Sequence, residues 1–193
     1  MTSKIRGLAR PRPAPSSAAA RRRSRLPSPR PPQSLSELGE AEALLLRSLR
    51  HWIVGLHHGD HDAWSMAWNA LARSLGSRQA RDAMGALSAL VSALCGHARR
   101  RIAYHQPCCA CLGPDEACLL ALVTDCQAGE LEAAKLRAAW LVEAAGVPVL
   151  LEASGRLAAA LGARGYRLTR RPEARATKLQ APTGLTLAAV TEG

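Results

Sequence analysis

Phenylalanine is absent from this 193-residue chain, and other aromatic residues are scarce, with two Tyr and four Trp. The core must therefore consist mainly of Leu, Ala and Val. Such a core suits packed helices better than β-sheets, because strands favour aromatic and β-branched side chains. Hydrophobic residues still make up 48% of the chain, and the length is that of one ordinary domain. We expect a single all-α domain.

Long hydrophobic runs are also missing. No stretch reaches the roughly 18 apolar residues of a membrane-spanning helix, so we expect no transmembrane span. The N-terminus lacks the apolar stretch of a secretory signal. Five of the six Cys lie between Cys108 and Cys126. In a chain without a signal, this clustering favours reduced thiols and a cytoplasmic location.

Acidic residues are absent from residues 1–35, which hold nine basic residues and seven Pro. Most of the net charge of +11 therefore belongs to this segment, since residues 36–170 carry 14 basic and 13 acidic residues. Pro locks the backbone and removes hydrogen-bond donors, so residues 1–35 are predicted to form a disordered basic arm. Residues 36–170 are predicted to form the helical domain, and residues 171–193, which lose the hydrophobic period, a flexible tail.

Three interpretations of the basic arm compete. It is a solvated tail, or a translation start assigned too early. Alternatively, it contacts nucleic acid or an acidic surface through the run Arg21-Arg22-Arg23-x-Arg25. The third interpretation is an organellar transit peptide, against which the density of Pro argues, because such peptides form amphipathic helices. The sequence indicates no other partner and no oligomeric state.

The hydrophobic period of residues 36–170 predicts a compact bundle of about six helices joined by short links. A capping box formed by Ser34 and Glu37 is expected to open the first helix, and Asp60 or Asp62 to cap the second. The predicted inward side chains include Leu56, Leu136, Trp140 and Leu141. The expected helices run from Ser34 to about Leu56, from about Asp62 to Leu75, from Arg78 to His97, from Pro114 to Ala128, from Glu130 to Ala145, and from Pro148 to about Gly162.

The segment between the third and fourth helices, within residues 99–118, is the most informative. Cys108 and Cys111 stand in C-x-x-C spacing, which allows two thiolates to bind one ion from a tight turn. His105 precedes them, and Cys118 lies about one turn into the next helix. If Cys108 and Cys111 converge, Cys109 points away as a spare thiol. The spacing predicts a metal site formed by His105, Cys108 or Cys109, Cys111 and Cys118.

Three chemistries fit these side chains. A Cys₃His zinc site would be closed and structural. An iron–sulfur cluster would make the protein a redox or gas sensor. Thiols near a helix N-terminus can also undergo redox chemistry without metal. Against all three, free Cys is often simply a small buried side chain, and this interpretation is favoured for Cys95 and Cys126, which lie in apolar stripes.

A second polar group is the run His57-His58-x-Asp60-His61-Asp62. Such a run can bind a divalent metal, but a turn between two helices, capped by Asp, explains the same residues and is the favoured interpretation. Arg99, Arg100 and Arg101 follow the third helix, where cations complement the helix dipole. No phosphate-binding loop, nucleophile elbow or paired-carboxylate signature is present.

The stretch His105-x-Pro107-x-Cys109-x-Cys111-Leu112-x-x-Asp115-Glu116 resembles a motif of small uncharacterised helical proteins of alphaproteobacteria. The resemblance continues through Leu119, Leu120, Leu122, Val123, Gln127 and Gly129. It implies a bacterial cytosolic setting and no particular activity. It includes Cys109 and Cys111, which makes Cys109 a rival to Cys108 as ligand.

The leading prediction is a non-enzymatic accessory or regulatory protein that binds metal, with zinc as the expected ion. The alternative is a redox-active or iron–sulfur regulator that uses the same thiols and contacts nucleic acid through residues 1–35.

Overall fold

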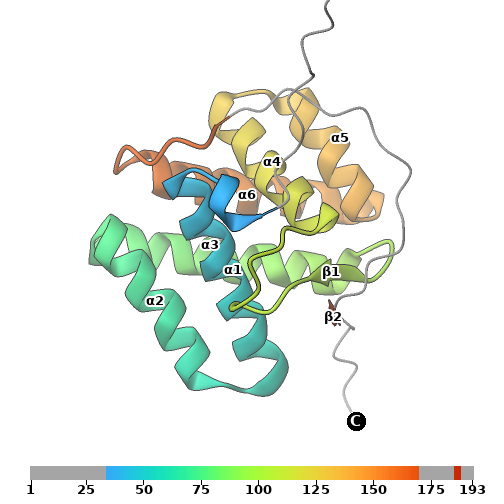
Figure 1. The fold of residues 1–193 in the computed structure, drawn as a ribbon. Helices are drawn as coiled ribbons and strands as arrows, with labels where there is room; N and C mark the ends of the chain where they lie inside the picture. The colour runs from blue at the N-terminus through green and yellow to red at the C-terminus, as the bar shows by residue number, and fades with distance from the viewer. Residues whose placement is uncertain (1–33, 170–184, 188–193) are drawn as a thin grey trace, which may run out of the picture.

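The computed structural model describes residues 34–169 and the backbone of residues 185–187. The predictions for residues 1–33, and for most of 171–193, lie outside the described residues. The described part is a bundle of six α-helices, as predicted (Figure 1). Its helices are α1 (Glu40–His58), α2 (His61–Leu75), α3 (Ser77–His97), α4 (Pro114–Ala128), α5 (Leu131–Leu141) and α6 (Val147–Gly162), with short 3₁₀ turns η1 (Leu35–Glu37) and η2 (Ala144–Gly146).

Local signals in the sequence set several helix ends. The Asp60 side chain caps α2, since its Oδ1 accepts the amides of Asp62 at 2.9 Å and Ala63 at 3.2 Å. Gly59 and Gly129 end α1 and α4 with φ of 62° and 77°, the left-handed conformation that glycine adopts without steric cost. The predicted polar turn between the first two helices is therefore confirmed.

The start of α1 differs from the expected one. Ser34 makes no side-chain cap, and the chain forms the short η1 turn before Leu38 becomes extended. The helix begins at Glu40 instead, where the Gly39 amide donates to Glu42 Oε2 at 2.6 Å. A buried carboxylate that accepts this amide is a better cap than an exposed serine hydroxyl.

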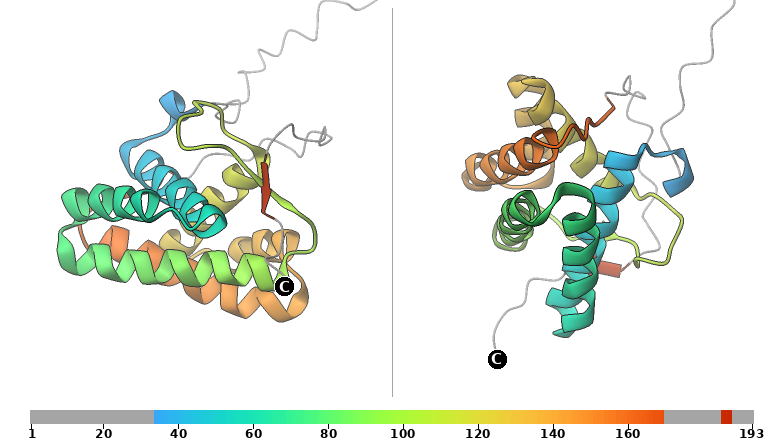
Figure 2. Two further views of the ribbon diagram at one scale, coloured as in Figure 1. Left: turned by 90° about the horizontal axis from the view of Figure 1, so that it is seen from below. Right: turned by 90° about the vertical axis from the view of Figure 1, so that its left-hand side faces the viewer.

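The core is formed by side chains from all six helices. The helix α3 makes its most extensive contact with α6, while α2 packs on both α1 and α3, and α4 on both α5 and α6 (Figures 1 and 2). Ala80, Ala83 and Ala86 on α3 are fully buried, and such small side chains allow neighbouring helices to approach closely. Leucines fill the remaining interior, as the lack of aromatic residues predicts.

In α5 the prediction of inward side chains is confirmed for Leu141 and wrong for Leu136 and Trp140. Leu136 is 75% exposed and Trp140 is 38% exposed, whereas the buried face consists of Ala134, Ala138 and Leu141. The Arg100 guanidinium lies 4.2 Å from the centroid of the Trp140 ring, a cation–π contact at the surface. Leu56 near the end of α1 is also exposed. The packing of α5 uses its alanine face, so its largest apolar residues remain outside.

A short antiparallel ladder was not predicted. The strand β1 (Ile102–Tyr104) pairs with β2 (Leu185–Leu187), with Ile102 opposite Leu187 and Tyr104 opposite Leu185. All three β1 residues are buried. Three residues are too few for an alternating pattern to be recognised in a sequence.

One described stretch, Ala144–Gly162, is long and apolar enough to cross a membrane by length and composition. It comprises η2 and α6, whose Leu150, Leu157 and Leu161 are fully buried against neighbouring helices. Length and composition are weak grounds for a span, because the central helix of a packed core meets the same criterion.

A glycine on α1 provides a test of the packing. The Cβ of Gly55→Ala would overlap the Trp64 ring of α2, and such overpacking costs about 1–3 kcal/mol. We expect urea unfolding to show a loss of free energy of that size. Gly155→Ala in α6, where an added Cβ meets nothing within 4 Å, should instead stabilise the protein by up to about 1 kcal/mol. Equal effects of the two substitutions would contradict this packing.

Candidate functional site

A buried ion pair joins α1 to α4 below the Cys/His loop. The side chains of Arg50 and Glu116 are 0% and 1% exposed. Arg50 Nε donates to Glu116 Oε1 at 2.7 Å, and Arg50 Nη2 donates to Oε2 at 2.9 Å. This bidentate geometry is the strongest pairing available to a guanidinium and a carboxylate. Each charge is tolerated in the interior because the other neutralises it.

The same guanidinium holds the backbone of the loop. Arg50 Nη1 donates to the carbonyl of Cys109 at 2.7 Å, and Nη2 donates to that of Cys111 at 2.6 Å. A longer contact of 3.5 Å joins Nη1 to the carbonyl of Gln106. The buried Arg50 side chain therefore binds the backbone in the middle of the loop between β1 and α4.

Glu116 fixes both ends of the loop. Its Oε1 accepts the amide of His105 at 3.0 Å, and its Oε2 accepts the amide of Gly113 at 2.9 Å. The Nδ1 atom of His105 lies 2.9 Å from Oε2. Burial by itself would raise the pKa of Glu116, but the hydrogen bonds from Arg50, His105 and Gly113 outweigh it and hold this pKa below its ordinary value.

The neighbouring acid, Asp115, has a separate structural role. Arg100 donates to its two oxygens at 2.8 and 2.7 Å, and the amide of Ala103 donates to Oδ2 at 2.7 Å. Asp115 thereby attaches β1 to the start of α4. The two adjacent acids have different partners, since Asp115 binds Arg100 and Ala103 whereas Glu116 binds Arg50. Arg100 serves this ion pair, a role that the sequence analysis missed.

The loop begins with a tight turn. The amide of Cys109 donates to the carbonyl of Gln106 at 2.9 Å, which places Pro107 and Cys108 at the two corners of the turn. Cys108 is exposed at this tip. Beyond the turn, Cys111 forms an antiparallel bridge with Ser34.

The structure brings Cys109 and Cys111 together. The amide of Cys111 donates to Cys109 Sγ at 3.4 Å. The Cys109 thiol also raises the pKa of Cys111, first through a side-chain hydrogen bond and then through its charge. Of the two rival cysteines, Cys109 is the one that Cys111 contacts, while Cys108 is exposed at the tip of the turn. Which of these thiols would hold a metal stays a prediction.

Cys118 lies in the first turns of α4. Burial raises the pKa of its thiol to about 12, and the charges acting on the thiol are those of Arg137, Asp115, Arg100 and Asp125. Its role as a ligand stays a prediction. Cys95 and Cys126 pack against the core, as predicted.

Within residues 34–169 and 185–187, no group of three or more His, Cys, Asp or Glu side chains is placed to hold a metal ion. The zinc and iron–sulfur assignments thus stay predictions. His105 remains of interest, because its Nδ1 is paired with a buried carboxylate. In metal sites a carboxylate commonly fixes a histidine ring in this way and leaves the other nitrogen to the metal.

The histidine run at the end of α1 serves local packing. The His61 ring lies edge-on to Trp64, with centroids 5.3 Å apart, and the His57 ring lies 6.4 Å from that of Tyr104. His57 Nε2 is buried and has no hydrogen-bond partner. Nothing in these contacts adds a ligand to the Cys loop.

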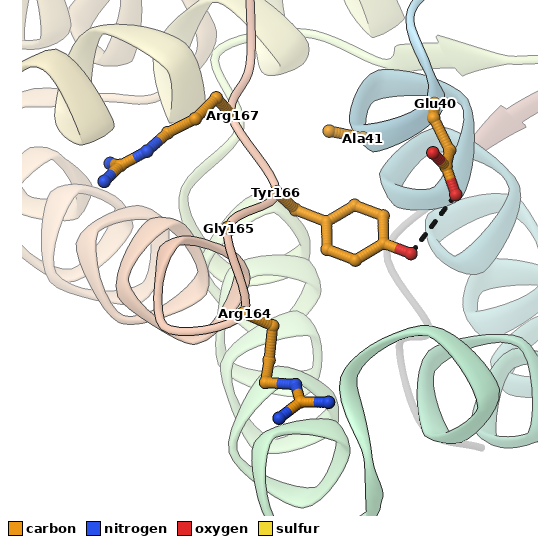
Figure 3. Close-up of a pocket in the computed structure, with 6 residues that line it drawn as sticks. All are labelled: Glu40, Ala41, Arg164, Gly165, Tyr166 and Arg167. Atoms are coloured by element: carbon orange, nitrogen blue, oxygen red, sulfur yellow. Dashed lines mark hydrogen bonds between the residues drawn. The ribbon is translucent and has the colours of Figure 1, made fainter.

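An open pocket lies away from the loop, between the start of α1 and the chain that follows α6 (Figure 3). The Tyr166 hydroxyl donates to Glu40 Oε1 at 3.2 Å across it. The side chains of Arg164 and Arg167 extend away from that carboxylate in Figure 3. No residue of the Cys/His loop lines the pocket, and we assign it no function.

No protein-family model, curated protein or solved structure matches this chain.

The buried ion pair should be a main source of stability. Arg50→Ala leaves the Glu116 carboxylate buried without its partner, and breaking such a pair costs about 3–5 kcal/mol. Urea unfolding should show this loss. The matched control is Lys135→Ala, which removes an exposed ion pair with Glu132 and should cost at most about 0.5 kcal/mol. A loss below about 1 kcal/mol for Arg50→Ala would contradict the role given to the pair.

The same pair predicts a pH dependence. Because the pKa of folded Glu116 lies below its ordinary value of 4.5, its ionisation stabilises the fold above pH 4.5. This contribution is lost as the pH falls through the lower, folded pKa. Compared with Glu132→Gln, an exposed control, Glu116→Gln should flatten the fall in unfolding free energy below pH 4.5. An unchanged acid profile would contradict the prediction.

Proposed function

We propose that this protein is a small helical regulatory protein whose Cys109-Ala110-Cys111 loop is a redox-active dithiol, oxidised reversibly to a disulfide. The observation that carries the proposal is the hydrogen bond from the Cys111 amide to Cys109 Sγ, which holds the two residues against each other, and the Cys109 thiol also raises the pKa of Cys111. Exposure of Cys111 and of the neighbouring Cys108 gives oxidants access to the loop. Reactive thiols are exposed in this way, whereas structural ones are buried.

The two thiols have different roles. The amide of Cys111 donates to Cys109 Sγ and so fixes the position of that sulfur. The pKa of Cys111 is raised by Cys109, so Cys111 retains its proton longer. Cys109 is therefore the attacking thiolate and Cys111 the resolving thiol, since the thiolate is the nucleophile.

A hydroperoxide is the class of oxidant that this arrangement suits. The Cys109 thiolate attacks the terminal oxygen, the O–O bond breaks, and Cys109 becomes a sulfenic acid while the hydroperoxide leaves as an alcohol. The Cys111 thiol then attacks the Cys109 sulfur, forms the S–S bond and releases water. In sum, two thiols and one hydroperoxide give one disulfide, one alcohol and one water.

The position of the loop favours reversibility. Exposed disulfides are the readily reduced kind, and thiols of the reducing cytosol can return Cys109 and Cys111 to the dithiol. We therefore place the protein in the cytoplasm. No catalytic turnover is needed for this role, because the redox state of the loop is itself the signal.

A second candidate is a metal-binding accessory protein. The pairing of His105 Nδ1 with buried Glu116 favours it, since this is how metal-binding histidines are commonly oriented. Zinc would then be held by His105, Cys109 and Cys111, with Cys108 brought in from the turn. An iron–sulfur cluster would use the three thiols alone.

The dithiol is tested by treating the reduced protein with one equivalent of hydrogen peroxide. We expect a mass loss of about 2 Da, the signature of one disulfide. Blocking the free thiols, reducing the disulfide, labelling the released thiols with a second alkylating agent and sequencing the peptide by tandem mass spectrometry should place the second label on Cys109 and Cys111. Cys109→Ser and Cys111→Ser should each abolish it. Cys108→Ser is the matched control and should retain it. Disulfide formation that requires Cys108 instead of Cys109 would contradict the proposal.

The two candidates are separated by elemental analysis and an absorbance scan of protein purified without oxygen. One zinc per chain, lost in His105→Ala, would support the metal site and count against a free dithiol. A brown protein bleached by air would support a cluster. Metal-free protein that forms the Cys109–Cys111 disulfide supports the dithiol.

A further inference from the structure

The carbonyls of the dithiol loop have two different partners. Those of Cys109 and Cys111 accept hydrogen bonds from buried Arg50. The carbonyl between them, that of Ala110, accepts the amide of Leu35 at 2.7 Å. With the bridge between Ser34 and Cys111, this contact attaches the start of the described chain directly to the dithiol.

We propose that the redox state of Cys109 and Cys111 controls whether the segment at Ser34–Leu35 remains docked on the domain. This inference rests on the proposed function, since it requires the disulfide to form. It adds the structural consequence of the redox change: oxidation releases the segment at Ser34–Leu35 from the domain, and reduction allows it to dock again.

The disulfide would act through the Ala110 backbone. A disulfide brings the two Cβ atoms to about 3.8 Å, and here the ring closes across a single residue. The peptide planes on both sides of Ala110 must adjust to that ring. Those planes carry the carbonyls that bind Arg50 and Leu35, so ring closure has to disturb at least one of these contacts.

Burial decides which contact breaks. Arg50 is fully buried and is held by Glu116, so loss of its carbonyl acceptors would leave buried donors without partners, which is costly. Ala110 is exposed and Leu35 only half-buried. The amide of Leu35 can exchange the Ala110 carbonyl for water. The contact between Leu35 and Ala110 is therefore the one that gives way.

Leu35 and Leu38 pack against the core, but no residue of η1 is fully buried. Segments without fully buried side chains open at lower cost than the core helices. The next firm attachment is the start of α1, where the Gly39 amide donates to Glu42. Release should therefore extend from Ser34 to about Leu38 and stop at α1.

The segment continues into residues 1–33, which carry nine basic residues and no acidic one. The redox state of the dithiol would thus determine whether this strongly basic stretch joins the domain at Ser34–Leu35 or only at the start of α1. Such a stretch suits the phosphates of nucleic acid, which is one of the interpretations of this segment that the sequence leaves open.

Hydrogen–deuterium exchange tests the inference through the Leu35 amide, the donor in the contact. We compare reduced protein with protein oxidised by hydrogen peroxide, and follow a peptide that covers Leu35. The Leu35 amide should exchange at least about tenfold faster after oxidation, because it loses its acceptor. Peptides from α3 serve as the internal reference and should not change.

The matched control is the double variant Cys109→Ser, Cys111→Ser, in which hydrogen peroxide should leave the exchange of Leu35 unchanged. If the Cys109–Cys111 disulfide forms and the exchange of Leu35 is unaltered, the inference is overturned while the redox dithiol stands. If no disulfide forms, the proposed function fails and the inference fails with it. Faster exchange in the oxidised double variant would also overturn the inference.

Discussion

The ion pair between Arg50 and Glu116 is the interaction on which the candidate site depends. It joins α1 to α4, which are distant in sequence. The other donors of Arg50 bind carbonyls of the loop, and the Glu116 oxygens also accept amides of the loop. Burying two charges is unfavourable unless every donor and acceptor finds a partner. Here the loop supplies those partners, so the conformation of an irregular segment is fixed by the needs of two buried side chains.

Local chemistry made most of the fold predictable. Asp60 and the glycines Gly59 and Gly129 set helix ends through short-range rules, and these elements appear as expected. The orientation of α5 was not predictable, because its buried face consists mainly of alanine and its leucine and tryptophan side chains remain exposed. Hydrophobic size guides a prediction only where large side chains provide the packing, and in α5 close approach of the backbone provides it.

The sequence singled out the loop between α3 and α4 but not the buried ion pair that holds it. The sequence does hold one sign of the buried ion pair. Arg50 lies within the apolar stripe of Leu46, Leu49 and Ile53 on α1, which indicates that its side chain is buried. Its partner could not be inferred, since Glu116 lies 66 residues further along the chain. The C-x-x-C spacing did not reveal the local contact, in which Pro107 and Cys108 form the corners of a turn and the amide of Cys111 donates to Cys109 Sγ.

The structure separates the residues that hold the loop from those that can react. Arg50, Asp115 and Glu116 are buried and bind backbone atoms, so replacing them should change the fold itself. The thiols of Cys109 and Cys111 lie on the outer side of that framework, and the loop is held through its carbonyls rather than through sulfur. Serine at these positions therefore preserves every hydrogen bond to Arg50. A change in the behaviour of such a variant would report the chemistry of the thiols and not a loss of structure.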